Sequence, residues 1–296
     1  MRHTGPPKSS ESDETPQSDV QTSRDRRSQL QLLVVEDNRT NQAVALGLLK
    51  QLGYRADVAA DGQSALRALA HNNYELVLLD CQLPDIDGYE IARHIRRSDA
   101  AVRNHNIAII ATTAHTSAGD AVKCLDAGMN GYLSKPLRLD ALERAIEQAI
   151  EQRTVVEPWT SVARVPVDPA PPPALSPNPE AAAFDREDFV ERLMGNEDLA
   201  RRIAQGFVDD MPLQLAALAR AVNDRDAPAV RLVAHSIRGA AANVSGLEIR
   251  EVARKLEQSG DAGDLTAAAA ALPELSASFE RARPILEKFC HDASDE

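Results

Sequence analysis

Five polar side chains in the first half of the chain stand at or just beyond the ends of short apolar runs: Glu36, Asp37, Asp80, Thr113 and Lys135. Three carboxylates gathered in one place would raise each other's pKa unless a cation neutralised them. A hard divalent ion held by carboxylates, with water and phosphate oxygens completing its shell, is the chemistry of Mg²⁺. The ammonium of Lys135 and the hydroxyl of Thr113 suit phosphoryl oxygens. This set therefore predicts a carboxylate that attacks phosphorus beside Mg²⁺ and forms an aspartyl phosphate.

A second candidate, His235, lies in an Ala-rich stretch of the second half. In a helix of 3.6 residues per turn, Val233 and Ile237 fall on the opposite side, so His235 is predicted to face solvent. Gly239 shares the face of His235, although a glycine within a helix costs about 1 kcal/mol relative to alanine. Close approach of another protein to the imidazole would account for it. Arg238 would either steady a phosphoryl group on the ring or decorate the surface.

The elements that must position the acidic set are short apolar runs alternating with amphipathic stretches. The predicted strands span 32–35, 56–59, 76–79, 107–111 and 131–133, and the predicted helices span 41–52, 64–70, 89–97, 120–127 and 139–152. Five repeats of strand and helix predict an α/β fold, a doubly wound five-stranded parallel sheet covered on both faces. Ligands of such sheets bind at the carboxyl ends of the strands, where the acidic set stands.

The second half lacks strand alternation and consists of long segments rich in Ala, Leu, Arg and Glu. Breaks at 195–196, 223–228, 245–246 and 260–264 divide it, which predicts an all-α antiparallel helical bundle. Pro212 and Pro273 fall within these segments, and we expect each of them to kink or restart its helix.

Length and composition set the organisation. The 296 residues favour two domains, and the predicted division is a disordered tail at 1–29, the α/β domain at 30–152, a Pro/Ala-rich linker at 153–183, the bundle at 184–290 and a tail at 291–296. A net charge of −12 makes nucleic acid a poor partner. No apolar stretch approaches the ~18 residues that a membrane span needs. The three cysteines show neither zinc nor disulfide spacing. From these two observations we expect a cytoplasmic protein without membrane insertion.

Taken together, the motifs of the first half resemble a response-regulator receiver domain, which has a flavodoxin-like fold. They are Glu36-Asp37, Asp80 followed by Leu83-Pro84 and Asp87-Gly88, Thr113-Ala114, and Lys135-Pro136. The resemblance implies that Asp80 is the phosphoacceptor, that Glu36 and Asp37 hold the metal, and that the backbone carbonyl of Gln82 is a further ligand. It also implies that Thr113 and Lys135 contact the phosphoryl group and that Tyr132 moves with Thr113 on switching. A haloacid-dehalogenase-type phosphatase would want a second Asp at the position of Gln82, which counts against that alternative.

The stretch from Ala234 to Asn243, with Gly246 beyond it, resembles a histidine phosphotransfer domain. That family is a helical bundle whose histidine accepts a phosphoryl group from one receiver aspartate and passes it to another. The family usually has Lys where this chain has Arg238, which keeps the charge but changes the geometry. The resemblance implies that His235 is the phosphorylated residue.

The combined resemblance implies a phosphorelay intermediate. Asp80 would accept a phosphoryl group from an upstream sensor histidine kinase and His235 would pass it to a downstream response regulator, with reverse flow equally allowed. The order of domains resembles the C-terminal part of hybrid sensor kinases, although Met1 favours a separate polypeptide, and we find no ATP-binding box of its own. A linker of this length would hold the two sites at roughly millimolar effective concentration, which makes transfer within one chain a hypothesis.

Two alternatives stay open at this point. In one, phosphorylation gates docking of the bundle and His235 is silent. In the other, the chain drains phosphate from a cognate regulator as a sink or phosphatase. A transcription factor is disfavoured, because the acidic second half shows no basic recognition helix.

Overall fold

In the computed structural model, residues 26–113, 118–152 and 183–292 are described. Ala114, most of the predicted linker and all but a few residues of the two predicted tails lie outside these ranges. None of the described helices is long and apolar enough to cross a membrane.

The first domain alternates strands and helices in the predicted order. The strands are β1 (Gln31–Val35), β2 (Arg55–Ala59), β3 (Leu76–Asp80), β4 (Ala108–Thr113) and β5 (Gly131–Ser134). The helices are α2 (Arg39–Gln51), α3 (Gly62–His71), α4 (Gly88–Arg96), α5 (Ala118–Asp126) and α6 (Leu139–Gln152). The strand order is β2-β1-β3-β4-β5 and every neighbouring pair is parallel, which confirms the predicted doubly wound α/β sheet.

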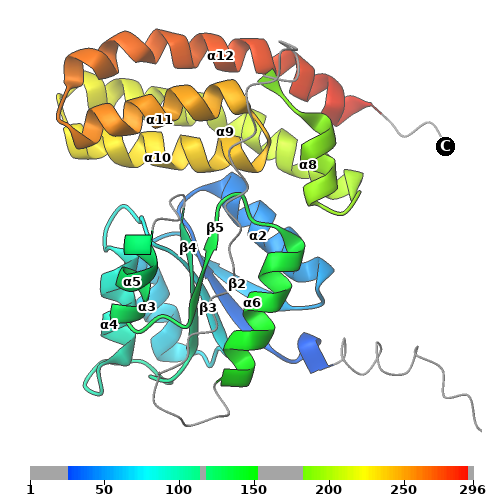
Figure 1. The fold of residues 1–296 in the computed structure, drawn as a ribbon, viewed down its shortest axis with the longest axis vertical. Helices are drawn as coiled ribbons and strands as arrows, with labels where there is room; N and C mark the ends of the chain where they lie inside the picture. The colour runs from blue at the N-terminus through cyan, green and yellow to red at the C-terminus, as the bar shows by residue number, and fades with distance from the viewer. Residues whose placement is uncertain (1–25, 114–117, 153–182, 293–296) are drawn as a thin grey trace, which may run out of the picture.

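Helices cover both faces of this sheet (Figure 1). Successive side chains of a strand point to opposite faces, so each strand contributes to two separate apolar layers. Leu32 and Val34 pack in the layer beneath α2 and α6, whereas Leu33 and Val35 pack in the layer beneath α3, α4 and α5. Burial on both faces explains why β1, β3 and β4 read as nearly continuous apolar runs, whereas the edge strand β2 is mostly exposed and contains Arg55 and Asp57.

The register of the sheet brings the acidic residues together at its carboxyl edge. Val35 of β1 pairs with Leu79 of β3, so the residues that follow them, Glu36 and Asp80, are adjacent at that edge. Asp80 in turn pairs with Thr112 of β4. Side chains more than 40 positions apart in the sequence therefore meet because parallel strands end on the same side.

Residues 26–29 correct part of the predicted disordered tail. Arg27 lies 2.8 Å from Glu143 and 2.5 Å from Glu147, both on α6, and its guanidinium donates to the backbone carbonyl of Leu52 at 3.3 Å. The average composition of this polar segment does not reveal that one arginine is anchored. The planar guanidinium of Arg27 makes several contacts at once.

The second half forms the predicted bundle of antiparallel helices. They are α8 (Arg186–Arg192), α9 (Glu197–Asn223), α10 (Ala227–Asn243), α11 (Leu247–Asp261) and α12 (Leu265–His291). The predicted breaks fall at the turns, where Asn196, Asp226 and Asp264 accept hydrogen bonds from the first turns of the helices that follow. Aromatic rings of Phe207 and Phe279 meet edge to face in the core between α9 and α12.

We expected each proline to kink or restart its helix, and the restart is wrong because neither helix is interrupted. Pro212 lies within α9 and Pro273 lies within α12, and each helix is continuous over 27 residues. Both prolines are on the exposed side of their helices, so water can satisfy the carbonyl that each leaves without a partner. Packing of the opposite side then keeps the helix intact.

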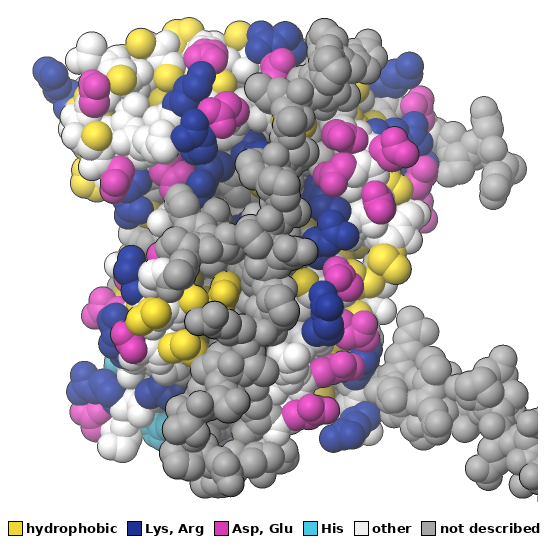
Figure 2. All heavy atoms as spheres, viewed as in Figure 1, with side chains coloured by type: hydrophobic (Ala, Val, Ile, Leu, Met, Phe, Trp, Pro, Cys, Tyr) yellow, Lys and Arg dark blue, Asp and Glu magenta, His cyan; other side chains and the backbone are white. Residues whose placement is uncertain are grey.

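The bundle lies across the carboxyl edge of the sheet, with α9 and α10 in contact with α2 (Figure 1). The apolar layer beneath α2 and α6 continues without interruption into the core of the bundle. On the face drawn in Figure 2, acidic and basic side chains are interspersed over both domains.

Candidate phosphotransfer site

An acidic centre lies at the carboxyl edge of the sheet. Carboxylate oxygens of Glu36, Asp37 and Asp80 come within 4.8 Å of one another. Glu36 and Asp80 are 4% and 1% exposed, and Asp37 is half-buried. Gly88 makes this packing possible, since a Cβ atom there would lie 2.3 Å from the backbone oxygen of Asp80. The start of α4 is thereby held against the end of β3.

Lys135 closes the acidic centre from the loop that follows β5. Its Nζ lies 2.6 Å from Oε2 of Glu36 and 2.6 Å from Oδ2 of Asp80. Burial alone would lower the pKa of Lys135, but Asp80 and Glu36 raise it above its ordinary value. The ammonium group therefore stays charged where it meets the two carboxylates.

Two carboxyl groups resist ionisation even with this lysine present. The pKa of Asp80 is raised to about 6. Burial is the largest cause; Lys135 acts in the opposite direction, and repulsion from Glu36 adds to the increase. Burial and then repulsion from Asp80 raise the pKa of Asp37 to about 6. One ammonium does not offset three clustered carboxylates, so the centre has the oxygen donors and the excess negative charge that suit a hard divalent cation.

The remaining predicted residues of the first domain lie around this centre. The backbone N–H of Gln82 donates to Oδ1 of Asp80 at 3.1 Å. Gln82 and Thr113 line a cleft of about 280 Å³ to which Arg231 of α10 also contributes. Tyr132 is half-buried against the apolar layer beneath α3, α4 and α5.

His235 is buried, so the prediction that it faces solvent is wrong. Its exposed fraction is 4%. Periodicity identifies the side of α10 that turns away from the apolar stripe, but the first domain covers that side. A Cβ atom at Gly239 would lie 3.2 Å from Nδ2 of Asn41 and 3.7 Å from Cδ of Lys135. The close approach that the glycine predicted is therefore made by the chain's own first domain.

Glu257 of α11 fixes the tautomer of the imidazole. Nδ1 of His235 lies 2.8 Å from Oε1 of Glu257. An ionised carboxylate can only accept, so Nδ1 carries the proton and Nε2 of the neutral ring keeps its lone pair. Burial lowers the pKa of His235 and so favours the neutral ring, although Glu257 acts in the opposite direction. Nε2 is buried and has no hydrogen-bond partner among the described residues.

Arg238 supports the same carboxylate and does not decorate the surface. Its Nε lies 2.8 Å from Oε2 of Glu257, and the residue is 8% exposed. Nη2 of Arg238 also lies 3.4 Å from Oε1 of Glu257 and 3.4 Å from Nδ1 of His235, so the guanidinium contacts both the carboxylate and the imidazole. Contact of Arg238 with a phosphoryl group stays a prediction.

Hydrogen bonds join the acidic centre to α10. Nδ2 of Asn38 donates to Oγ of Ser236 at 3.0 Å, next to the histidine. Nδ2 of Asn243 donates to Oδ1 of Asn41 at 2.8 Å, and Nδ2 of Asn41 donates to Oε1 of Glu36 at 2.8 Å. The two candidate sites therefore face each other within one chain.

Sequence reasoning missed Glu257 and these four polar partners. Glu257 had a detectable signal, because it follows Val252, Ala253 and Leu256 on the buried stripe of α11, where an acidic residue is out of place unless it has a partner. Asn38 could have been identified as the residue that caps α2. Nothing in the sequence indicated that its amide also reaches the bundle.

The fold and the two facing centres define a signalling module that carries an acidic phosphoacceptor pocket and a histidine on a helical bundle. The family model of the response regulator receiver domain matches residues 32–147, and that of the Hpt domain matches residues 202–284. The chain contains a receiver domain followed by an Hpt domain, a combination that implies phosphorelay signal transduction by Asp and His phosphotransfer.

Known proteins similar to this chain include hybrid sensor kinases. The sensor histidine kinase AruS of Pseudomonas aeruginosa is 33% identical over 216 residues, which cover 72% of this chain and 19% of the kinase. Virulence sensor protein BvgS of Bordetella bronchiseptica is 29% identical over 240 residues, which cover 79% of this chain and 19% of BvgS. The chain thus spans about a fifth of the length of either relative.

One solved structure similar to the first domain is the receiver domain of a Pseudomonas aeruginosa sensor histidine kinase, determined with a magnesium ion in its active site cleft. It is 41% identical and covers 41% of this chain and 98% of that domain, with a TM-score of 0.38.

Proposed function

We propose that this chain is a phosphorelay intermediate in which Asp80 accepts a phosphoryl group from a sensor histidine kinase and His235 exchanges it with a response regulator. The observation that carries the proposal is Nε2 of His235, which is buried without a hydrogen-bond partner in the described part of the chain and lies on a helix that packs against the Asp80 centre. A histidine placed there by chance would more simply be exposed or hydrogen-bonded on both nitrogens. The ATP-dependent step is assigned to the histidine kinase that donates the phosphoryl group.

Residues of the acidic centre divide the work of the first step. Glu36, Asp37, Asp80 and the backbone carbonyl of Gln82 would hold Mg²⁺, which supplies neutralisation of the carboxylates and of the incoming phosphoryl oxygens. An oxygen of Asp80 forms the bond to phosphorus while the bond between phosphorus and the kinase histidine breaks, with its electron pair left on that nitrogen. Lys135, which lies 2.6 Å from that carboxylate, contacts the phosphoryl oxygens from the opposite side together with the hydroxyl of Thr113.

In the second step the phosphoryl group moves from oxygen to nitrogen. The lone pair of His235 Nε2 attacks phosphorus, and the bond between phosphorus and Asp80 breaks with its electron pair left on the carboxylate. Nδ1 keeps its proton, so the phosphorylated ring carries a positive charge beside Glu257. That carboxylate, 2.8 Å away, offsets the charge, and the step runs in either direction.

The proposal is tested by following label from radioactive acetyl phosphate, an acyl phosphate donor, in the full chain with Mg²⁺. Wild type, Asp80→Asn and His235→Gln are compared, with His71→Gln as the matched control because His71 is exposed on the first domain. Acyl phosphate is labile to alkali, whereas phosphohistidine is stable to alkali and labile to acid. The proposal expects alkali-stable label in wild type and His71→Gln, and none in the other two variants.

A different pattern would overturn it. Alkali-stable label that survives in His235→Gln would place the phosphohistidine elsewhere. Alkali-labile label alone, unaffected by His235→Gln, would make the Hpt domain a docking module whose histidine is silent.

A further inference from the structure

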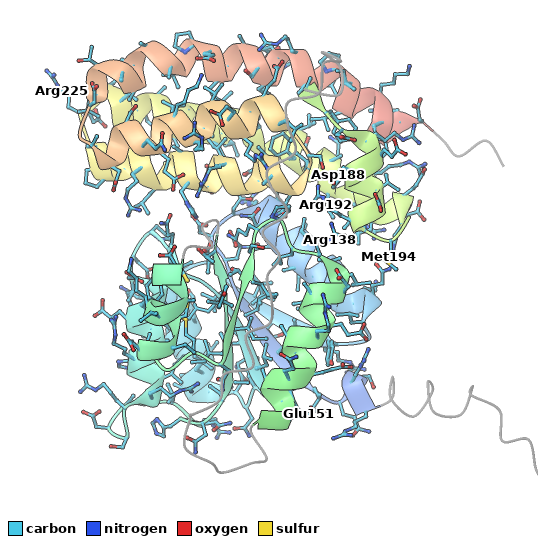
Figure 3. The ribbon with its side chains drawn as sticks, viewed as in Figure 1. Arg138, Glu151, Asp188, Arg192, Met194 and Arg225 are labelled. Atoms are coloured by element: carbon cyan, nitrogen blue, oxygen red, sulfur yellow. The ribbon has the colours of Figure 1, made fainter. Side chains whose placement is uncertain are left out.

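The contact between the two domains has a polar part and an apolar part. The polar part is the pair of interdomain hydrogen bonds from Asn38 and Asn243, each buried. The apolar part includes Gly47 of α2, which faces Leu199 of α9, within a cluster that runs from beneath α2 into the bundle. In Figure 3, Arg138, which precedes α6, lies near Arg192 of α8, and Arg138 pairs with Asp140 of its own domain at 3.6 Å.

This contact hides both phosphoryl sites at the same time. Asp80 is 1% exposed and His235 is 4% exposed. A kinase histidine that must reach Asp80 and a regulator aspartate that must reach His235 would each need the space that the other domain of this chain occupies. Transfer within the chain needs the contact, whereas every exchange with an outside protein needs it broken.

We propose that α2 of the receiver domain and α9 and α10 of the Hpt domain form a docking surface for each other, whose closure shields Asp80 and His235 from outside partners. The kinase therefore competes with the Hpt domain for Asp80, and the regulator competes with the receiver domain for His235. The inference rests on the proposed phosphorelay function, but closure itself involves no phosphoryl group and is measurable without one.

Gly47 is the position that sets this docking. A Cβ atom there would lie 2.5 Å from Cδ1 of Leu199, closer than carbon atoms pack. Glycine disfavours a helix, and the three atoms nearest to this Cβ position all belong to Leu199 of α9, so the contact with the bundle gives a reason for glycine in the middle of α2. Gly47→Gln favours the helix and places a long side chain where Leu199 must sit. Gly206 of α9, whose Cβ direction is empty among the described residues, gives the matched control Gly206→Gln.

The first measurement is the rate at which diethyl pyrocarbonate modifies His235, followed by mass spectrometry of the full unphosphorylated chain. His71, which is exposed, serves as the internal reference. In wild type and Gly206→Gln, His235 is expected to react at least about tenfold more slowly than His71, because only the open fraction reacts. In Gly47→Gln the two rates converge. Asn243→Asp perturbs the contact from the other domain, because it replaces the amide that donates to Asn41 with a carboxylate close to the acidic centre. The reaction rates of His235 and His71 are expected to converge in this variant too.

The second measurement is transfer between chains. His235→Gln protein labelled on Asp80 with acetyl phosphate is mixed with Asp80→Asn protein, and label on His235 is followed. Adding Gly47→Gln to the Asp80→Asn acceptor alone, so that the donor keeps the α2 surface that must meet α9, is expected to raise the initial rate about tenfold, in line with the larger open population of the acceptor. Gly206→Gln leaves the rate unchanged.

Two results would overturn the docking surface: His235 as reactive as His71 in wild type, or protection that persists in both Gly47→Gln and Asn243→Asp. Expected protection combined with no phosphohistidine in any mixture would instead refute the proposed relay and leave the docking surface standing. The failure of one is thus distinguishable from the failure of the other.

Discussion

The ion pair behind the histidine offers a prediction whose size follows from burial. Glu257 and Arg238 are 6% and 8% exposed, so removing the carboxylate leaves a guanidinium without its partner in a nearly dry site. Breaking a buried ion pair from one side costs about 3–5 kcal/mol. We therefore expect Glu257→Leu to lower the free energy of unfolding by that amount. Glu257→Gln, which keeps an oxygen to accept from Nδ1 of His235, costs less.

Stability and function separate when both partners are replaced. A buried pair exchanged for apolar residues of similar volume is often neutral in stability. Glu257→Leu with Arg238→Met is thus expected to regain most of the lost stability. His235 still loses the acceptor that fixes its ring, and misplacing a reacting group by about 1 Å costs roughly 100-fold in rate. Transfer from Asp80 to His235 should stay slow in a chain that is stably folded.

Three readouts decide this prediction. Urea unfolding gives the free energies, single-turnover labelling gives the transfer rate, and nitrogen NMR of the imidazole reports whether Nδ1 still carries the proton. The exposed ion pair Lys255–Glu274, at 3.3 Å on the same bundle, is the control, and Glu274→Leu is expected to leave all three unchanged. Wild-type transfer in the stable double variant would refute the role given to Glu257.

Three further expectations concern the acidic centre. Asp37→Asn should stabilise the metal-free chain at pH 7.5 by at most about 3 kcal/mol, because folding raises the pKa of Asp37 from 3.8 to about 6 and so penalises the ionised form above that pH. This gain in stability must vanish below pH 4 in thermal unfolding scans, and a gain that persists at low pH would contradict the prediction. The variant should also lose the stabilisation that Mg²⁺ gives wild type. Lys135→Met leaves Asp80 and Glu36 without their shared cation, so unfolding should cost about 3–5 kcal/mol less, with part of the loss regained on adding Mg²⁺. Equal stability with and without the lysine in urea titrations would show that the pair does not hold the centre. In Gly88→Ala the added methyl group meets the backbone of Asp80, so the variant should lower the free energy of unfolding by about 1–3 kcal/mol and slow labelling by acetyl phosphate. Gly131→Ala, which adds a methyl group in open space, is the control for the steric effect.

Much of the fold could be predicted because its signals are local. Short apolar runs bounded by turn residues identify the strands, and the five-fold alternation with helices allows few topologies. Once the strands are parallel, Glu36, Asp80 and Lys135 must meet at one edge, so the acidic centre follows from the sequence. The tail was predicted less well, because Arg27 is one anchored residue in a polar window.

The prolines show where a local rule gives way to packing. A proline removes one hydrogen bond from a helix, but Pro212 and Pro273 sit on exposed sides of helices whose other sides are buried. The stabilisation of the packed side outweighs the local loss, and no property of the sequence around a proline measures that packing.

The sequence by itself determined that an aspartate and a histidine suited to phosphotransfer occur in one chain, each on a recognisable element. Only the tertiary structure decided that His235 is buried against the first domain, that Glu257 holds its proton on Nδ1, and that Asn41 connects Glu36 to Asn243. Helical periodicity tells which residues share a side of a helix, but what covers that side depends on contacts between segments far apart in the chain. Those contacts come from the packing of two domains, which leaves no periodic trace in either.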